Sequence, residues 1–178
     1  MLVPTVFPSQ AADTALVQSA RDGNRAAFGE LYGRYRRMVH GILLAHVSYA
    51  DAEDLMQSVF MQAMQRLPAL RDTEAFGGWL AAIARNLAFD HHRRRKNLVE
   101  LNESECGPVR AHEPALALEA IRRLPEAYRE TLMLRLVEGM TGPEIAARTS
   151  LTPDSVRVNL CRGMKLLRAQ LGGKGDHA

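Results

Sequence analysis

The segment PEIAARTSLTPDSVRVNLCRGMKLLRAQL, residues 143–171, contains two short helical patterns separated by a break. Residues 143–148 are predicted to form the first helix, and residues 149–151 the turn that follows it. Thr152 is expected to cap the second helix, with Pro153 at its first position, where a missing N–H costs nothing. An apolar stripe then follows at helical spacing, made of Val156, Leu160, Met164, Leu167 and Leu171.

The face opposite this stripe combines small and basic side chains. Its members are Ser155, Val158, Cys161, Arg162 and Lys165. A short helix with a basic outer face, braced by a preceding helix, is the helix-turn-helix arrangement that enters a DNA major groove. The segment therefore predicts a unit that reads DNA, with Arg162 pointing straight outward and Arg157 toward the flank.

Composition favours an all-α protein without a membrane span or a disulfide framework. Hydrophobic residues make up 47% of the 178 residues and aromatic residues only 6%, and alternating strand patterns are scarce. Cys106 and Cys161 are too few and too far apart for a disulfide framework. No apolar run reaches the length of a membrane span, and no signal-like segment opens the chain, so a cytoplasmic location is expected.

Apolar stripes in the first half predict a small helical bundle. Asp13 is expected to cap a first helix, and a break at residues 23–24 precedes the second. The second helix is expected to bury Phe28, Leu31, Tyr32, Tyr35 and Val39. The third is expected to bury Met56, Val59, Phe60, Ala63, Met64 and Leu67 before Pro68 ends it, and the fourth Phe76, Trp79, Leu80, Ile83, Ala84 and Leu87.

An acidic segment separates the two halves. Residues 97–114 hold four acids and one base, a net charge of −3, so the rest of the chain carries +6. We interpret the chain as a flexible arm (1–12), a helical domain (13–96), a flexible acidic linker (97–114), a helix-turn-helix domain (115–171) and a tail (172–178). A positive charge concentrated in the two domains suits proteins that meet a polyanion.

The order of the motifs resembles that of bacterial sigma factors of the extracytoplasmic-function (ECF) group, in the sigma-70 family. The similarity covers residues 13–171. It implies two small helical domains, one sigma-2-like and one sigma-4-like, in a subunit that binds core RNA polymerase and directs promoter recognition, DNA melting and initiation. The motifs that carry it are Ala27-Phe28, Leu31-Tyr32, residues 51–57 with Val59-Phe60, Trp79-Leu80, residues 83–86 with Asp90, Leu124-Pro125, residues 144–146 and Val156.

The resemblance also implies binding surfaces. Asp54, Gln57 and Ser58 correspond to the face that binds the clamp of the largest polymerase subunit, although many members have Glu at the position of Ser58. The loop of residues 68–74, with Arg71 and Asp72, corresponds to the part that captures an unstacked base of the −10 element. The family's promoter-contacting helix holds Asn86, Asp90, Arg93 and Arg94, whose basic members meet phosphates.

In the recognition helix, the family's −35 contacts correspond to Arg157, Val158, Cys161 and Arg162, with Lys165 on the same face. Arg162 is the candidate for a bidentate contact with guanine or for a phosphate contact. Val158 stands where a small polar residue is often found, and Cys161 replaces a bulkier side chain in some relatives. The expected partners are core polymerase (clamp and flap), promoter DNA and an anti-sigma factor, with no membrane contact of the chain's own.

Two other classes of function fit parts of the sequence. A free-standing helix-turn-helix repressor or activator would account for the C-terminal half, but it would leave residues 51–60 and the acidic linker without a role. An enzyme or metal site could draw on Asp90, His91, His92, Cys106 or His112, yet no metal-ligand spacing or nucleophile constellation is present. Trp79 lies on the apolar stripe, so packing is favoured over base stacking. The sequence therefore predicts no catalysis, cofactor or metal.

Overall fold

The computed structural model describes residues 10–101 and 113–172, and in this part every regular element is a helix. The first half contains α1 (Gln10–Arg21), α2 (Arg25–Leu44), α3 (Tyr49–Arg66), the short 3-10 helix η1 (Leu67–Ala69) and α4 (Phe76–Leu101). The second half contains α5 (Glu113–Arg122), α6 (Glu126–Leu132), the π-helical turn η2 (Met133–Val137), α7 (Gly142–Thr149) and α8 (Pro153–Gly172). The expectation of an all-α fold is confirmed.

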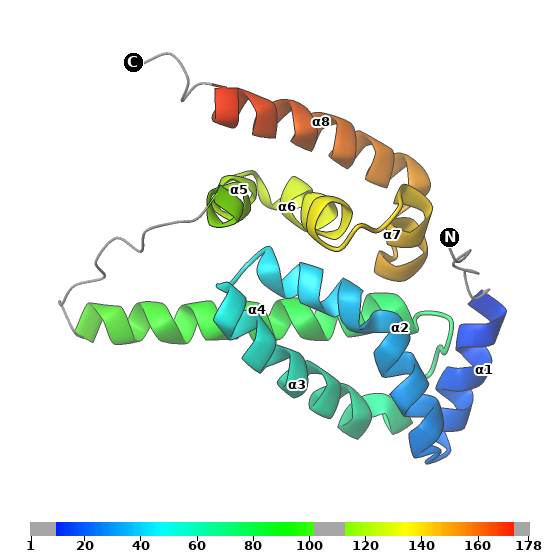
Figure 1. Cartoon of the computed structure of the whole chain (residues 1–178). Coiled ribbons are helices and arrows are strands. Elements are labelled where there is room, and N and C mark those ends of the chain that lie inside the picture. Colours follow the sequence, from blue (N-terminus) through cyan, green and yellow to red (C-terminus); the bar gives the residue numbers. More distant parts are fainter. Residues whose placement is uncertain (1–9, 102–112, 173–178) are drawn as a thin grey trace.

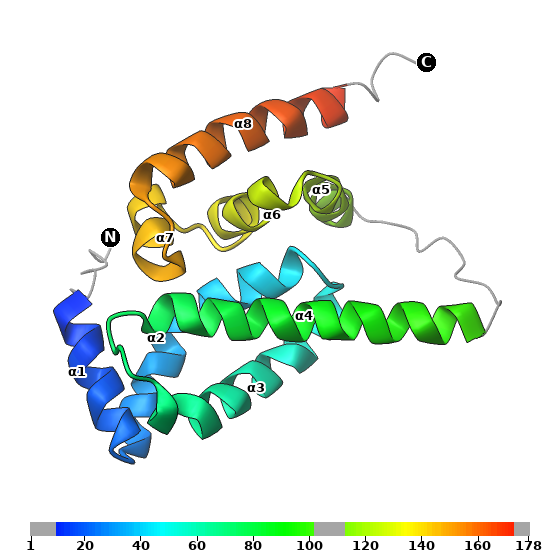
Figure 2. The same cartoon turned by 180° about the vertical axis from the view of Figure 1, so that it is seen from behind.

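Helices α1–α4 form an N-terminal bundle, and α5–α8 form a C-terminal domain that lies across α2 and α4 (Figures 1 and 2). Helix α2 packs on α1, α3 and α4, while α7 contacts both α2 and α4. The buried residues make one continuous cluster that runs from Val17 in α1 to Leu167 in α8. The two halves are therefore packed against each other.

Short polar side chains begin the bundle helices. Asn24 accepts hydrogen bonds from the backbone N–H groups of Ala26 and Ala27, at 3.0 and 3.2 Å, and so caps α2. Ser48 caps α3 by accepting from Asp51 N at 3.2 Å. Asp13 does not cap α1, contrary to expectation, because that helix already begins at Gln10.

The helix-turn-helix forms as predicted. Thr141 and Glu144 make a reciprocal capping box at the start of α7, with Thr141 N donating to Glu144 Oε2 at 2.7 Å. Ser150 takes a left-handed conformation, φ 61°, where the chain turns toward α8. Thr152 Oγ1 accepts from Ser155 N at 3.2 Å, which confirms it as the cap of the recognition helix.

The ends of the two halves differ in detail from the sequence interpretation. Helix α4 continues to Leu101, through residues 97–101 that were assigned to the linker, and α5 starts at Glu113. The predicted arm lies outside the described residues except for residues 10–12, which belong to α1. Most of the linker, 102–112, and residues 173–178 of the tail also lie outside them.

Candidate polymerase and nucleic-acid interface

The outer face of α8 presents the predicted −35 side chains to solvent. Arg157, Cys161, Arg162 and Lys165 are exposed, and Val158 is half-buried. Arg157 makes only a peripheral ion pair with Asp154, 3.3 Å between two highly exposed side chains. Because Val156 and Leu167 on the opposite face are buried, the basic face is fixed outward. Apart from Val158, this surface has the exposure that a major-groove helix requires.

A second polar face runs along α4. Asn86, Asp90 and Arg93 are spaced i, i+4 and i+7, so they lie on one side of the helix, and Arg94 lies next to them. Arg93 Nη2 donates to Asp90 Oδ1 at 2.7 Å, and the Arg93 side chain is three-quarters exposed. The predicted −10 residues of this helix thus form a continuous polar surface.

The loop before α4 holds the other two predicted −10 residues. Arg71 and Asp72 are exposed, and Asp72 Oδ1 accepts from Glu74 N at 2.9 Å. Leu70 anchors the loop to α1, because its carbonyl accepts from Arg21 Nη1 at 3.0 Å. Trp79 is half-buried against the core, its ring centroid 5.7 Å from that of Phe76. This burial agrees with the packing role predicted for Trp79.

The predicted clamp-binding residues Asp54, Gln57 and Ser58 are all exposed on α3. Gln57 also borders a groove of about 400 Å³ between α2 and α3, which we call the methionine groove. Its lining comprises Phe28, Tyr32, Glu53, Met56, Gln57, Phe60, Met61 and Met64. Flexible, polarisable methionines are common on surfaces that bind other proteins.

The prediction that Tyr32 and Met64 belong to the core is wrong, because both line the methionine groove. Tyr32 and Met64, assigned to the core, are 41% and 50% exposed, and Met61, which was not singled out, is 54% exposed. Helical spacing identifies the side of α3 that is apolar, but it cannot show whether another helix covers that whole side. A stripe wider than the available packing partner was the signal that could have revealed the groove.

The junction between the two halves contains several specific polar contacts. Arg148 of α7 donates from Nη1 to Arg34 O at 2.6 Å, and Arg122 of α5 donates from Nε to Leu44 O at 2.9 Å. His40 lies between two carboxylates, with Nδ1 2.6 Å from Glu138 Oε1 and Nε2 3.2 Å from Glu53 Oε1. The hydrogen bond with Glu138 raises the pKa of His40 above its ordinary value despite the opposing effect of burial.

Glu130 of α6 is a second largely enclosed acid of this junction. Its Oε1 lies 3.0 Å from His46 Nε2, and its carboxylate receives two hydrogen bonds from Arg85 Nε and one from Arg85 Nη2. Burial alone would raise the pKa of Glu130, but the hydrogen bonds from His46 and Arg85 more than offset that effect and lower it. Glu130 is therefore held ionised between a histidine and an arginine of the N-terminal bundle.

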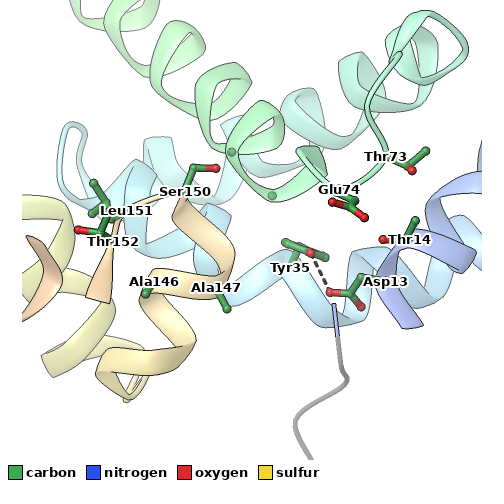
Figure 3. Close-up of a pocket in the computed structure, with 12 residues that line it drawn as sticks. Asp13, Thr14, Tyr35, Thr73, Glu74, Ala146, Ala147, Ser150, Leu151 and Thr152 are labelled. Carbon is green, nitrogen blue, oxygen red and sulfur yellow. Dashed lines mark hydrogen bonds between the residues drawn. The ribbon is translucent and has the colours of Figure 1, made fainter. Parts of the chain in front are cut away.

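Glycines allow the two halves to approach closely. A Cβ atom on Gly41 would lie 2.7 Å from Leu134 Cδ2, and one on Gly78 would lie 2.0 Å from Ser150 Oγ. Beside Gly78 a pocket of about 240 Å³ opens between α1, the start of α4 and the α7–α8 turn (Figure 3). Figure 3 shows Asp13 in this pocket already engaged by the Tyr35 hydroxyl, which donates to it at 2.8 Å.

Among the described residues, no group of three or more His, Cys, Asp or Glu side chains is arranged to hold a metal ion. His91, a candidate metal ligand in the sequence, has its Nε2 atom 3.5 Å from Asp51 Oδ1. Within the same part of the chain, no helix has both the length and the apolar character needed to cross a bilayer. Cys161 is a free, exposed thiol, whereas Cys106 and His112 lie outside the described residues.

These features define a two-domain helical DNA-binding protein whose C-terminal domain carries a helix-turn-helix. Residues 31–98 match the family model for sigma-70 region 2, and residues 115–167 match that for sigma-70 region 4. The chain belongs to the sigma-70 family of RNA polymerase sigma factors, in the ECF group, and directs promoter recognition in transcription initiation. The family resemblance seen in the sequence is thereby confirmed, and a free-standing repressor is not favoured.

The similarity to known sigma factors extends over nearly the whole chain and supports membership of the ECF group. RNA polymerase sigma factor CarQ of Myxococcus xanthus is 33% identical over 162 residues, covering 85% of this chain and 93% of CarQ. The ECF RNA polymerase sigma-E factor of Haemophilus influenzae is 26% identical, covering 91% and 96%. The solved structure of CnrH, in complex with the cytosolic domain of CnrY, is 27% identical and has a TM-score of 0.62, covering 90% and 97%.

Proposed function

We propose that this sigma factor divides its work among three surfaces of the described chain. The face of Asp54, Gln57 and Ser58, together with the neighbouring methionine groove, binds the clamp of the largest polymerase subunit. The polar side of α4 and the preceding loop bind the −10 element, and the outer face of α8 binds the −35 element. The observation that carries this assignment is that each surface is exposed on a separate helix.

The clamp surface combines two kinds of interaction. The exposed sulfur and aromatic groups of Met61, Met64 and Tyr32 supply an apolar groove, and Asp54 and Gln57 supply polar groups at its side. Burying such a groove against a partner contributes favourable free energy in proportion to its apolar area. The polar groups then fix the orientation of the partner.

The two DNA surfaces differ in how they read sequence. On α8, Arg162 can place its planar guanidinium against the O6 and N7 acceptors of a guanine in the major groove. On α4, Arg93 and Arg94 contribute phosphate contacts, which give affinity that depends on salt but not sequence. Asn86 and Asp90 supply the hydrogen-bonding groups that can distinguish bases on an exposed strand.

An anti-sigma factor is proposed as a further partner. CnrH, which is similar over 90% of this chain, has been solved with the cytosolic domain of CnrY. The methionine groove is a fitting site for such a protein, because covering it would also block the clamp. We also propose that the chain acts in the cytoplasm and performs no catalysis of its own.

Two variants with opposite expected effects test whether polymerase binding and −35 binding use separate surfaces. Arg162→Ala is expected to reduce transcription from a promoter that depends on its −35 element while core polymerase still co-purifies with the chain. Asp54→Ala with Gln57→Ala is expected to lower affinity for core polymerase first. If Arg162→Ala abolished core binding, or if the double variant retained full core affinity, the assignment of the surfaces would be wrong.

A further inference from the structure

Arg85 stands out among the residues of α4 because its binding partner lies in the other half of the molecule. Its guanidinium forks onto Glu130 of α6, with Nε 2.8 Å from Oε1 and Nη2 2.8 Å from Oε2. The two acids that raise the pKa of Arg85, Glu130 first and Glu126 second, both belong to the C-terminal domain, while burial opposes them. Separating the two halves would therefore release this side chain.

The fork has the geometry that an arginine also uses for phosphate. Two parallel N–H donors on one side of the guanidinium match two oxygens of either a carboxylate or a phosphate. The Glu130 carboxylate therefore resembles a backbone phosphate in its contact with Arg85. Its position is also fixed by His46, whose Nε2 lies 3.0 Å from Glu130 Oε1. Once the carboxylate has left, the same N–H donors can bind two oxygens of a phosphate.

The surroundings of Arg85 on α4 are those of a strand-binding surface. Asn86, the next residue, begins the polar face that also holds Asp90 and Arg93. One turn beyond Arg85, Phe89 is 45% exposed, and its ring packs in an edge-on arrangement with His46, with ring centroids 4.9 Å apart. An exposed aromatic ring beside a cationic side chain is the combination that binds unpaired bases by stacking and charge.

We propose that Arg85, together with Phe89, contacts the unpaired strand of the melted −10 region, and that Glu130 occupies this contact when the two domains are packed together. The inference rests on the proposed function of α4. It adds Arg85 and Phe89 to the proposed −10 surface. It also implies that packing of the two domains prevents Arg85 from binding a DNA phosphate, because Glu130 then occupies its guanidinium. Arg85 therefore binds Glu130 in the closed form and a DNA phosphate in the open form.

A purely structural ion pair makes a different prediction about substitutions. If Arg85 and Glu130 served only to hold the domains together, removing either one would open the molecule and affect DNA binding in the same direction. Under the proposal the two substitutions have opposite effects. Glu130→Gln frees the guanidinium and strengthens binding, whereas Arg85→Ala removes the contact and weakens it.

The test uses the full chain, alone and bound to core polymerase, with a fluorescent fork-junction DNA whose −10 segment is single-stranded. For the holoenzyme, Arg85→Ala is expected to weaken binding about tenfold, the effect of losing one charge-assisted contact, and Phe89→Ala by a similar factor. The slope of log affinity against log salt should fall by about 0.7 for Arg85→Ala. Arg25→Ala, at an exposed arginine that begins α2, serves as the matched control and should bind as the wild type does.

For the chain alone, Glu130→Gln is expected to raise affinity for the same DNA at least about threefold, and Arg85→Ala with Glu130→Gln should lose that gain. Gly41→Leu opens the junction without altering either charge, since its side chain would collide with Leu134, and it should reproduce the gain if Glu130→Gln fails to fold. Equal affinities of wild-type and Arg85→Ala holoenzyme, or a loss caused by Glu130→Gln, would overturn the proposal. If wild-type holoenzyme itself failed to bind the fork, the proposed function of α4 would be at fault instead.

Discussion

Arg148 of α7 and Tyr35 of α2 form a cation–π contact across the junction, with the guanidinium carbon 5.7 Å from the ring centroid. The same guanidinium donates to the backbone carbonyl of Arg34 at 2.6 Å. One side chain of the helix-turn-helix therefore holds both an aromatic ring and a backbone acceptor of the N-terminal bundle. This contact joins the helix-turn-helix domain, for which we propose −35 binding, to the bundle that carries the proposed −10 surface.

Arg148→Ala should loosen the packing of the two domains without unfolding either one. The lost cation–π contact and charged hydrogen bond together stabilise the closed form by about 1–3 kcal/mol. Energy transfer between dyes on Cys161 and on a cysteine introduced by Gln65→Cys, in a Cys106→Ser background, measures the separation. We expect a larger separation for Arg148→Ala and an unchanged one for Arg168→Ala, an exposed arginine on α8. Identical separations in all three proteins would contradict a role for Arg148.

The packing of the domains should weaken on acidification because of Glu130. Its folded-state pKa is lowered by His46 and Arg85, so its contribution is complete above the ordinary glutamate value of about 4.3 and is lost as the pH falls through the lowered pKa. The dye separation should therefore increase at acid pH. Glu130→Gln should remove this acid limb, and an acid limb of unchanged size in that variant would exclude Glu130 as its origin.

His40 should produce a second, alkaline limb of the same titration. Its pKa is raised chiefly by Glu138, so its contribution is complete below about 6.5 and is lost as the pH rises through the raised pKa. The closed form should thus be most stable between the two limbs. His40→Gln should abolish the alkaline limb and leave the acid limb; persistence of the alkaline limb would show that another group causes it.

Thr152→Ala should destabilise the start of the recognition helix. Loss of the hydrogen bond from Ser155 N to the Thr152 hydroxyl costs about 1 kcal/mol, typical of a helix N-cap. We expect a lower midpoint in denaturant unfolding and weaker transcription from a −35-dependent promoter. Thr152→Ser, which keeps a capping hydroxyl, is the control and should retain both properties; a stability equal to that of the wild type in Thr152→Ala would exclude the cap.

The sequence predicted those features that depend on neighbours along the chain. The cap at Thr152, the burial of Val156 and Leu167 and the exposed face around Arg162 follow from residue type and a period of 3.6. Leu171, at the end of the predicted stripe, is 48% exposed, so the stripe was predicted one turn too long. The end of α3 was also predictable, because Pro68 stops an α-helix. Asp13 was the exception, since a good capping residue does not prevent a helix from starting earlier.

Features that depend on distant residues could not be predicted in this way. Glu130 meets Arg85 and His46 across 45 and 84 positions of the chain, and nothing in the local pattern distinguishes it from a solvated acid. The role of Gly41 is visible only because Leu134 lies above it. The exposure of Met64 likewise depends on how far along α3 the helix α2 packs against it.

The central function of this chain is to direct core polymerase to defined promoters. The direct measurement is transcription of genomic DNA by core polymerase free of other sigma factors, with and without the purified chain, followed by mapping of RNA 5′ ends. We predict start sites that appear only with the chain, share two upstream sequence elements, and disappear with the Asp54→Ala, Gln57→Ala double variant. If the chain bound core polymerase but added no start site, or did not bind it at all, it would not be a promoter-directing subunit.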